Sequence, residues 1–433
     1  MISADSPLDH VTPYDRFAWR DTQIERWLAS GAHAPELNAY FGRAEYRTLS
    51  ALARRAQRAV ADPALRVFIV PGIMGSQLGL LRPPPLPHDI VWIDPIDIER
   101  GRLAALRLPG VARVVPLGVV LFSYLRLKLY LRAHGLRAEF HDYDWRLPVA
   151  QLGHGLAARL RSAAPAPVAI VAHSMGGLVA RAALTHLESR QVQRVLLLGT
   201  PNSGSFAAVQ ALRGTYAVVR KVARLDAGAS AETLTSEVFS SFPSLYDLLP
   251  GGTGGADLFD PAGWPKSGPR PRVELLQAAR AARGQFAPAD ERFTVIAGVG
   301  QETVTAIVRR GDEFVYTLTR HGDGTVPTSS ATLAGARCAF ARVAHSDLTR
   351  DPQVAAAVVD ILRKGRTRRL PDSWSSASRA RVHISDRQLR RTHVDKVDWA
   401  ALEPRERHLF LQNLNEPPHL KLRVPRAVRR QRR

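Results

Sequence analysis

The segment Ala172-His173-Ser174-Met175-Gly176 has the residue types of a serine nucleophile held on a sharp turn. It lies where an apolar run, 168–171, gives way to a helical pattern of small residues, 177–184. A serine hydroxyl is a weak nucleophile at neutral pH, so a protein that uses one exposes it on a strained turn beside a base and backbone N–H donors. The usual pattern is Gly-x-Ser-x-Gly, and Ala172 replaces the first glycine with a single methyl group. The alternative interpretation is a strand-to-helix turn without chemistry.

Asp323 and His345 follow the serine in the chain order that hydrolases of this type require, which is nucleophile, acid, histidine. Asp323 stands between two glycines, in a tight turn that can present its carboxylate to an imidazole while backbone N–H groups hold it. His345 follows the apolar run 338–343. We therefore expect Ser174, Asp323 and His345 to form a catalytic triad in which the imidazole accepts the serine proton.

Four other titratable residues lie near these motifs and are alternatives: His173, His321, Asp142 and Asp144. His173 adjoins the serine and His321 lies close to the acid. The two aspartates precede the serine, which is the wrong chain order for the acid of the triad.

Two backbone N–H groups are needed to stabilise the oxyanion of a tetrahedral intermediate. Met175, directly after the serine, supplies one. The loop after an earlier strand supplies the other, and the glycine-containing segment 71–76 fits this role. Within it we expect Ile73 to be the second donor, and the alternative is an ordinary glycine turn.

The elements that must position these residues form an alternating pattern. Short apolar runs separated by helical patterns occur at 67–70, 138–143, 168–172, 195–198, 293–297 and 338–343. This alternation predicts an α/β fold of the α/β-hydrolase type, with a mostly parallel sheet and helices on both faces. Reactive groups are then expected at the carboxyl ends of the strands, where Ser174 lies.

Three regions follow from this pattern. Residues 1–63 are predicted to form an N-terminal helical extension, 64–363 the α/β domain, and 364–433 a basic, partly disordered C-terminal extension, with disorder expected at 426–433. The stretch 206–292 breaks the alternation and is predicted to be a cap or lid insertion. We expect its apolar side chains, among them Phe242 and Leu245, to contact acyl chains.

Six motifs in this order resemble the lecithin:cholesterol acyltransferase family, which includes lysosomal phospholipase A2 and phospholipid:diacylglycerol acyltransferases. The resemblance covers about Val67 to Leu362, and its motifs are Pro71 to Leu78, Tyr143 to Arg146, Ala172 to Gly177, Gly199 to Ser205, Pro243 to Pro250 and Gly322 to Pro327.

The resemblance implies an α/β-hydrolase core with cap and lid insertions. It carries over Ser174, Asp323 and His345 as triad, and Ile73 with Met175 as oxyanion donors. It also implies that Trp92, within 91–94, belongs to an element that lines the acyl pocket. The chain lacks the cysteine pair and the signal peptide of the secreted animal members, which argues against extracellular lipoprotein action.

Composition sets further limits. The chain has 433 residues and a net charge of +21, and residues 364–433 carry nineteen Lys and Arg against seven Asp and Glu. This excess favours peripheral contact with an anionic membrane surface, and we expect no nucleic-acid partner. The alternative is an arginine-rich composition with a solvated tail. Cys338 is the single cysteine, which excludes an intramolecular disulfide, and no metal-binding pattern occurs, so we expect no metal and no cofactor.

The start of the chain has neither the basic residues nor the apolar stretch of a signal peptide, and we expect a cytoplasmic protein, peripheral at membranes. The expected function is serine-dependent acyl hydrolysis or O-acyl transfer on phospholipids or related lipid esters, through an acyl-serine intermediate. One alternative is an esterase or triacylglycerol lipase without acyl transfer. Another is a basic binding protein, for membrane or nucleic acid, that keeps the scaffold without turnover.

Overall fold

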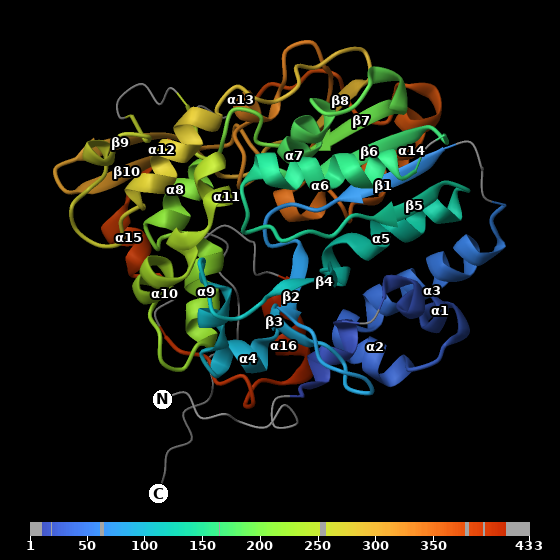
Figure 1. Cartoon of the computed structure of the whole chain (residues 1–433), viewed down its shortest axis with the longest axis horizontal. Helices are drawn as coiled ribbons and strands as arrows, with labels where there is room; N and C mark the ends of the chain where they lie inside the picture. The colour runs from blue at the N-terminus through green and yellow to red at the C-terminus, as the bar shows by residue number, and fades with distance from the viewer. Residues whose placement is uncertain are drawn as a thin grey trace, which may run out of the picture.

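A six-stranded, entirely parallel sheet forms the centre of the molecule (Figure 1). The computed structural model describes residues 11–412 except 19, 61–64, 164, 252–256, 377–380 and 393–394. The strand order is β5-β1-β6-β7-β8-β11, and every neighbouring pair runs parallel. The strands are β1 (Arg66–Val70), β5 (Arg137–Phe140), β6 (Val168–His173), β7 (Val192–Leu198), β8 (Phe293–Gly298) and β11 (Arg337–Ala341). The predicted α/β fold is confirmed.

Helices cover both faces of this sheet, which is why its strands read as continuous apolar runs. Along β6, Ile170 and Ala172 pack into one hydrophobic cluster, whereas Ala169 and Val171 pack into another. The first cluster includes α6 (Val149–Arg161) and α7 (Met175–Leu184), and the second includes α5 (Leu121–Ala133) and α14 (Pro352–Lys364).

The N-terminal segment is helical and packs on the α5 side of the sheet (Figure 1). It contains η1 (Pro13–Ala18), α1 (Asp21–Ser30), α2 (Ala34–Phe41) and α3 (Arg43–Arg58). Lys128 of α5 forms buried ion pairs with Asp21 and Glu25 of α1. These helices therefore share a core with the central sheet.

The insertion between β7 and β8 consists mostly of helices, which gather in Figure 1 beside the small sheet that contains β9 (Thr303–Arg310) and β10 (Glu313–Thr319). They are α8 (Phe206–Leu212), α9 (Ala217–Leu225), α10 (Ala231–Glu237), η4 (Phe239–Ser241), α11 (Pro243–Asp247), η5 (Pro261–Gly263) and α12 (Val273–Ala282). Their apolar side chains pack into the same cluster as α6 and α7, so the insertion lies on that side of the sheet.

Two three-stranded antiparallel sheets flank the central sheet. One has the order β3-β2-β4, formed by β2 (Ser76–Leu80), β3 (Asp89–Trp92) and β4 (Val115–Val119). The other has the order β12-β10-β9, formed by β9 (Thr303–Arg310), β10 (Glu313–Thr319) and β12 (Val382–Ser385). The remaining elements are α4 (Pro95–Glu99), η2 (Arg102–Leu106), η3 (Ser189–Gln191), α13 (Thr328–Ala331), η6 (His345–Asp347), α15 (Asp386–Arg390) and α16 (Pro404–Gln412).

Part of the C-terminal extension belongs to the folded body. Strand β12 pairs with β10, and buried Asp386 accepts hydrogen bonds from Arg213 at 3.0 Å and from the Tyr316 hydroxyl at 2.7 Å. Trp399 is also buried. Residues 426–433, where we expected disorder, lie outside the described residues.

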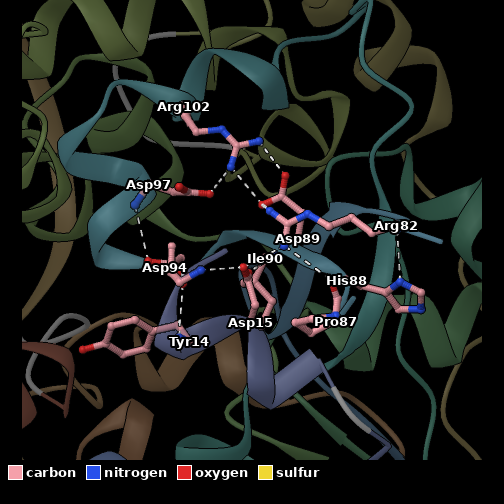
Figure 2. Close-up of polar contacts among 11 residues, drawn as sticks. Tyr14, Asp15, Arg82, Pro87, His88, Asp89, Ile90, Asp94, Asp97 and Arg102 are labelled. Carbon is pink, nitrogen blue, oxygen red and sulfur yellow. Dashed lines mark hydrogen bonds and ion pairs between the residues drawn. The ribbon is translucent and has the colours of Figure 1, made fainter. Parts of the chain in front are cut away.

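A buried network of carboxylates and guanidinium groups joins η1 to β3 and α4 (Figure 2). Asp15 pairs with Arg82 at 2.8 Å and accepts the Ile90 N–H at 2.9 Å. Arg102 lies between Asp89, at 2.6 Å, and Asp97. Asp94 caps α4 by accepting the Ile96 N–H at 2.8 Å.

This network holds four carboxylates, those of Asp15, Asp89, Asp94 and Asp97, against two guanidinium groups. Burial, with the neighbouring carboxylates, raises the pKa of Asp94 to about 7 and that of Asp97 to about 8. The Asp97 Oδ1 atom is buried without a partner in the described part of the chain. Near neutral pH, the carboxyl groups of Asp94 and Asp97 therefore bind a proton more readily than a free aspartate does.

Within the described residues, no helix combines the length and the apolar character needed to cross a bilayer.

Candidate active site

Ser174 lies on the turn between β6 and α7, with its backbone in the left-handed region at φ 54°. Small neighbours allow this turn to pack. A Cβ on Gly72 would stand 2.8 Å from the Ser174 Cβ, and a Cβ on Gly176 would stand 2.3 Å from the Pro71 carbonyl oxygen. Ala172 is buried in β6 and its methyl group is accommodated there. The predicted strand, turn and helix are present, with the serine at the carboxyl end of a central strand.

The structure brings Ser174, His345 and Asp323 together in one hydrogen-bonded line. His345 Nε2 lies 2.9 Å from Ser174 Oγ, and His345 Nδ1 lies 2.7 Å from Asp323 Oδ2. Asp323 is almost fully buried, while the His345 side chain keeps 12% of its surface exposed. These positions allow the imidazole to accept the serine proton while the carboxylate fixes its orientation.

Backbone N–H groups hold the Asp323 carboxylate, as the glycine-flanked turn predicts. The other carboxylate oxygen, Oδ1, accepts the N–H of Thr325 at 2.9 Å and of Val326 at 2.7 Å. The Asp323 carbonyl oxygen accepts the His345 N–H at 2.8 Å. The acid and the histidine are therefore joined through both side chain and backbone.

A second set of hydrogen bonds supports His345 from the opposite side. The Gly72 N–H donates to the Tyr124 hydroxyl at 2.9 Å, and this hydroxyl lies 3.0 Å from His173 Nδ1. His173 Nε2 lies 3.0 Å from the His345 carbonyl oxygen. Because that oxygen can only accept, His173 Nε2 must carry the proton, and the Tyr124 hydroxyl donates to Nδ1.

His173 stays neutral in this position. Burial is the larger cause and the nearby His345 adds to it, and together they lower the pKa of His173 to about 3. His173 thus connects the loop after β1 to the backbone of His345. Sequence reasoning treated it as an alternative histidine and missed Tyr124, which lies 49 residues away in the chain.

The two expected oxyanion donors lie at the same end of the sheet as Ser174. Met175 is the first residue of α7, so its N–H has no acceptor within the helix. Ile73 lies in the loop after β1, where Met74 has a left-handed backbone at φ 61° and Ile73 lines the pocket beside Ser174. Trp92 holds this loop, because its Nε1–H donates to the Met74 carbonyl oxygen at 3.0 Å.

A pocket of about 80 Å³ opens beside Ser174 and His345. Its walls are mostly apolar and come from the loop after β1, from α8 and from α11. Leu245 lines it, as expected. Trp92 and Phe242 do not, since both are buried in the core, each 5.5 Å from Trp145 in edge-on ring contacts. That these two residues contact substrate stays a prediction.

Two of the other alternative residues, His321 and Asp144, have partners outside the triad. His321 is exposed and packs its ring against Trp374. Asp144 binds the Arg146 guanidinium at 2.7 Å and 2.8 Å. Among the described residues, no group of three or more His, Cys, Asp and Glu side chains is arranged to hold a metal ion.

Comparison with known proteins gives partial matches. Residues 156–240 match the family described as PGAP1-like alpha/beta domain, and this stretch includes β6, the Ser174 turn and α7. A search of curated proteins finds no match.

Solved structures similar to this chain include hydrolases of low sequence identity. The mature lipase BlEst2 of Bacillus licheniformis is 16% identical over 71% of this chain and 94% of that chain, with a TM-score of 0.37. The Tle4–Tli4 complex contains a chain 14% identical over 70% and 98%, with a TM-score of 0.39. The NocB thioesterase domain from the nocardicin cluster is 14% identical over 71% and 95%, with a TM-score of 0.29.

An entirely parallel central sheet, helices on both faces, and a serine on the turn after a central strand, followed in the chain by Asp323 and His345, define an α/β domain of the hydrolase type.

Proposed function

We propose that this protein is a serine-dependent carboxylic ester hydrolase that acts on lipid acyl esters through an acyl-serine intermediate. One observation carries the proposal: an unbroken line of hydrogen bonds from Asp323 through His345 to Ser174, ending at an apolar pocket. Such a line is what converts a weak hydroxyl nucleophile into a reactive one.

The first half of the reaction forms the acyl-enzyme. Ser174 Oγ attacks the ester carbonyl carbon while His345 Nε2 takes the hydroxyl proton. The carbonyl oxygen becomes an oxyanion, and the N–H groups of Met175 and Ile73 stabilise its charge. The intermediate then collapses, the C–O bond to the leaving alcohol breaks, and His345 returns its proton to that alcohol.

The second half releases the acyl group. Water attacks the acyl-serine, with His345 again as base, to give a free carboxylic acid. An alcohol in the same position gives a new ester and therefore O-acyl transfer. The resemblance of the six sequence motifs to the lecithin:cholesterol acyltransferase family supports this second acceptor, and the same three residues serve both outcomes.

A short-chain esterase is the second candidate, and the size of the pocket favours it. The space beside Ser174 is about 80 Å³, whereas small-molecule pockets commonly measure about 300–1,000 Å³. Ala208 and Ala211 of α8 and Leu245 of α11 limit its extent. A long acyl chain fits only if these helices move away from the sheet.

A hydrolysis series separates the two candidates. Initial rates are measured on p-nitrophenyl esters from acetyl to palmitoyl, with and without phospholipid vesicles and with a long-chain alcohol as added acceptor. The lipid proposal expects the highest kcat/KM on long chains in the presence of vesicles. A maximum at two to four carbons that vesicles leave unchanged would assign the short-chain esterase instead.

Ser174→Ala is the control for this series. It should remove turnover of every ester, by about a thousandfold or more in kcat, because loss of the nucleophile disables the whole triad. Turnover that survives in Ser174→Ala would contradict the serine mechanism. Absence of turnover on all esters in the wild-type protein would favour the non-catalytic binding protein.

A further inference from the structure

A cleft between α2 and α16 lies outside the candidate active site and has two chambers that share Ala39, Pro404 and His408. Helix α16 packs against α2, so the cleft joins the N-terminal helices to the C-terminal extension. None of the residues that line the pocket beside Ser174 lines either chamber.

The first chamber is apolar and aromatic. It measures about 580 Å³, which is within the range of about 300–1,000 Å³ that is common for small-molecule pockets. Its walls include five aromatic side chains, those of Tyr14, Phe17, Trp27, Tyr40 and Trp399. Glu36, the one carboxylate that the described part of the chain places at this chamber, is paired with Arg16 at 4.0 Å and with His33 at 3.8 Å.

The second chamber is cationic. It measures about 1020 Å³ and is lined by Arg43, Arg350 and Arg405. Glu45 is the one carboxylate among the described residues that line it, and it faces Arg126 at 3.6 Å. Arg43 and Arg405 form no ion pair with any carboxylate in the described part of the chain. Arg350 Nη1 lies 3.8 Å from Asp347 Oδ1, and its buried Nε–H finds no acceptor among the described residues.

We infer that this cleft binds a single-chain anionic amphiphile, with its hydrocarbon chain in the aromatic chamber and its carboxylate or phosphate among the three arginines. Apolar walls that continue into a surplus of positive charge complement a ligand with both properties. The segment that follows α16 is a poor alternative occupant, because residues 413–433 carry seven basic side chains and one acidic side chain.

This inference goes beyond the proposed function, because it concerns a second site. The two sites meet at one short segment of chain. Thr349 lines the pocket beside Ser174, whereas the next residue, Arg350, lines the cationic chamber. A ligand bound at Arg350 therefore lies on the segment that follows His345.

The test measures binding to Ser174→Ala protein by titration calorimetry, which keeps the result independent of turnover. The probes are palmitate, 1-palmitoyl lysophosphatidate and hexadecanol, each below its aggregation concentration. Ala39→Trp places an indole at the junction of the two chambers and should weaken palmitate at least tenfold. Ala51→Trp, at an exposed position of α3 outside the cleft, is its control and should bind as the parent does.

The charge of the site is tested with Arg43→Ser/Arg405→Ser. This variant removes two partly exposed ion pairs with the palmitate carboxylate, so the Kd of palmitate should increase about fivefold. Hexadecanol has no charge, so its binding should not change. Arg47→Ser/Arg54→Ser removes the same charge from exposed positions of α3 and should bind palmitate as the parent does.

Palmitate and lysophosphatidate distinguish the two anionic headgroups by their relative affinities, and the inference requires at least one of them to bind. Equal palmitate binding by the parent and Ala39→Trp would overturn it. So would equal weakening of palmitate and hexadecanol in Arg43→Ser/Arg405→Ser, or no binding of either anion.

Discussion

Replacing His173 tests whether this residue holds His345 in position without itself taking part in proton transfer. The His173 ring lies between the Tyr124 hydroxyl and the His345 carbonyl oxygen, at 3.0 Å from each. His173→Phe keeps a ring of similar shape in this buried position but removes both hydrogen bonds. The Tyr124 hydroxyl and the His345 carbonyl oxygen are then left without these partners.

The size of the effect follows from those two groups. A buried polar group without a partner costs about 1–3 kcal/mol, so the free energy of unfolding should fall by about 2–6 kcal/mol. His345 should also lose its fixed position relative to Ser174, for which we expect kcat to fall about 10- to 100-fold. KM for a small soluble ester should change little, because the phenyl ring of His173→Phe keeps the place of the His173 ring in the pocket wall.

Two further variants make this test specific. His173→Gln can retain an N–H donor towards the His345 carbonyl oxygen, so it should recover most of kcat. Tyr124→Phe removes the hydroxyl that accepts the Gly72 N–H and donates to His173. It should lower kcat although the hydrogen bond between His173 Nε2 and the His345 carbonyl oxygen remains.

The assay combines denaturant unfolding with kcat and KM on p-nitrophenyl butyrate. Because the pKa of His173 is lowered to about 3, the ring is neutral across the assay range, and His173→Gln should keep the shape of the pH–rate profile. Wild-type kcat in folded His173→Phe would refute the reasoning. A changed profile in His173→Gln would show that His173 titrates.

Three other predictions follow. Gly72→Ala should lower kcat about a hundredfold with the fold intact, because its Cβ would stand 2.8 Å from the Ser174 Cβ. Gly155→Ala is the control, because a Cβ at this position of α6 would meet no atom within 4 Å. It should keep kcat and raise the free energy of unfolding by about 0.5–1 kcal/mol. Because the pKa of Asp97 is raised to about 8 in the folded state, its protonation contributes to the free energy of unfolding fully below about pH 4, the pKa of an unfolded aspartate, and this contribution is lost as pH rises through 8. Asp97→Asn imitates the protonated form, so its melting temperature relative to the wild type should rise from pH 5 to pH 9, and a constant difference would contradict this. Truncation after Asn415 removes seven basic residues and should reduce sedimentation with anionic vesicles at low salt. Each basic residue near an anionic membrane contributes about 1 kcal/mol to binding. Unchanged sedimentation would exclude the tail from membrane contact.

The central sheet could be predicted from the sequence because both of its faces are buried. All six predicted apolar runs became its six parallel strands, from β1 to β11. Runs such as 168–171 are apolar throughout because α6 and α7 cover one face and α5 and α14 the other. Such runs stand out from a polar background without any knowledge of tertiary contacts.

The smaller sheets could not be predicted in this way. Strands β2 and β4 contain Gly79 and Pro116, which weaken a strand pattern, and they depend on pairing with each other. Strand β12 comes from the C-terminal extension and pairs with β10 more than sixty residues earlier. Short helices such as α8 and α11 lack the length over which a helical period can be recognised.

The candidate triad could be predicted from the sequence because chain order and strand ends are local features. The packing of the residues around the triad could not be predicted in this way. Phe242 and Trp92 are apolar and near the right motifs, yet their burial against Trp145 depends on how three distant segments pack. The role of His173 depends on Tyr124, and no spacing in the sequence connects the two.

The central claim is that Ser174 is the nucleophile of an ester hydrolase. The most direct test is reaction of the full chain with a fluorophosphonate, followed by intact mass and peptide mapping. We expect one phosphonyl adduct on Ser174, no adduct in Ser174→Ala and much slower labelling in His345→Ala. Absence of an adduct in the wild-type protein, or an adduct on another residue, would contradict the account.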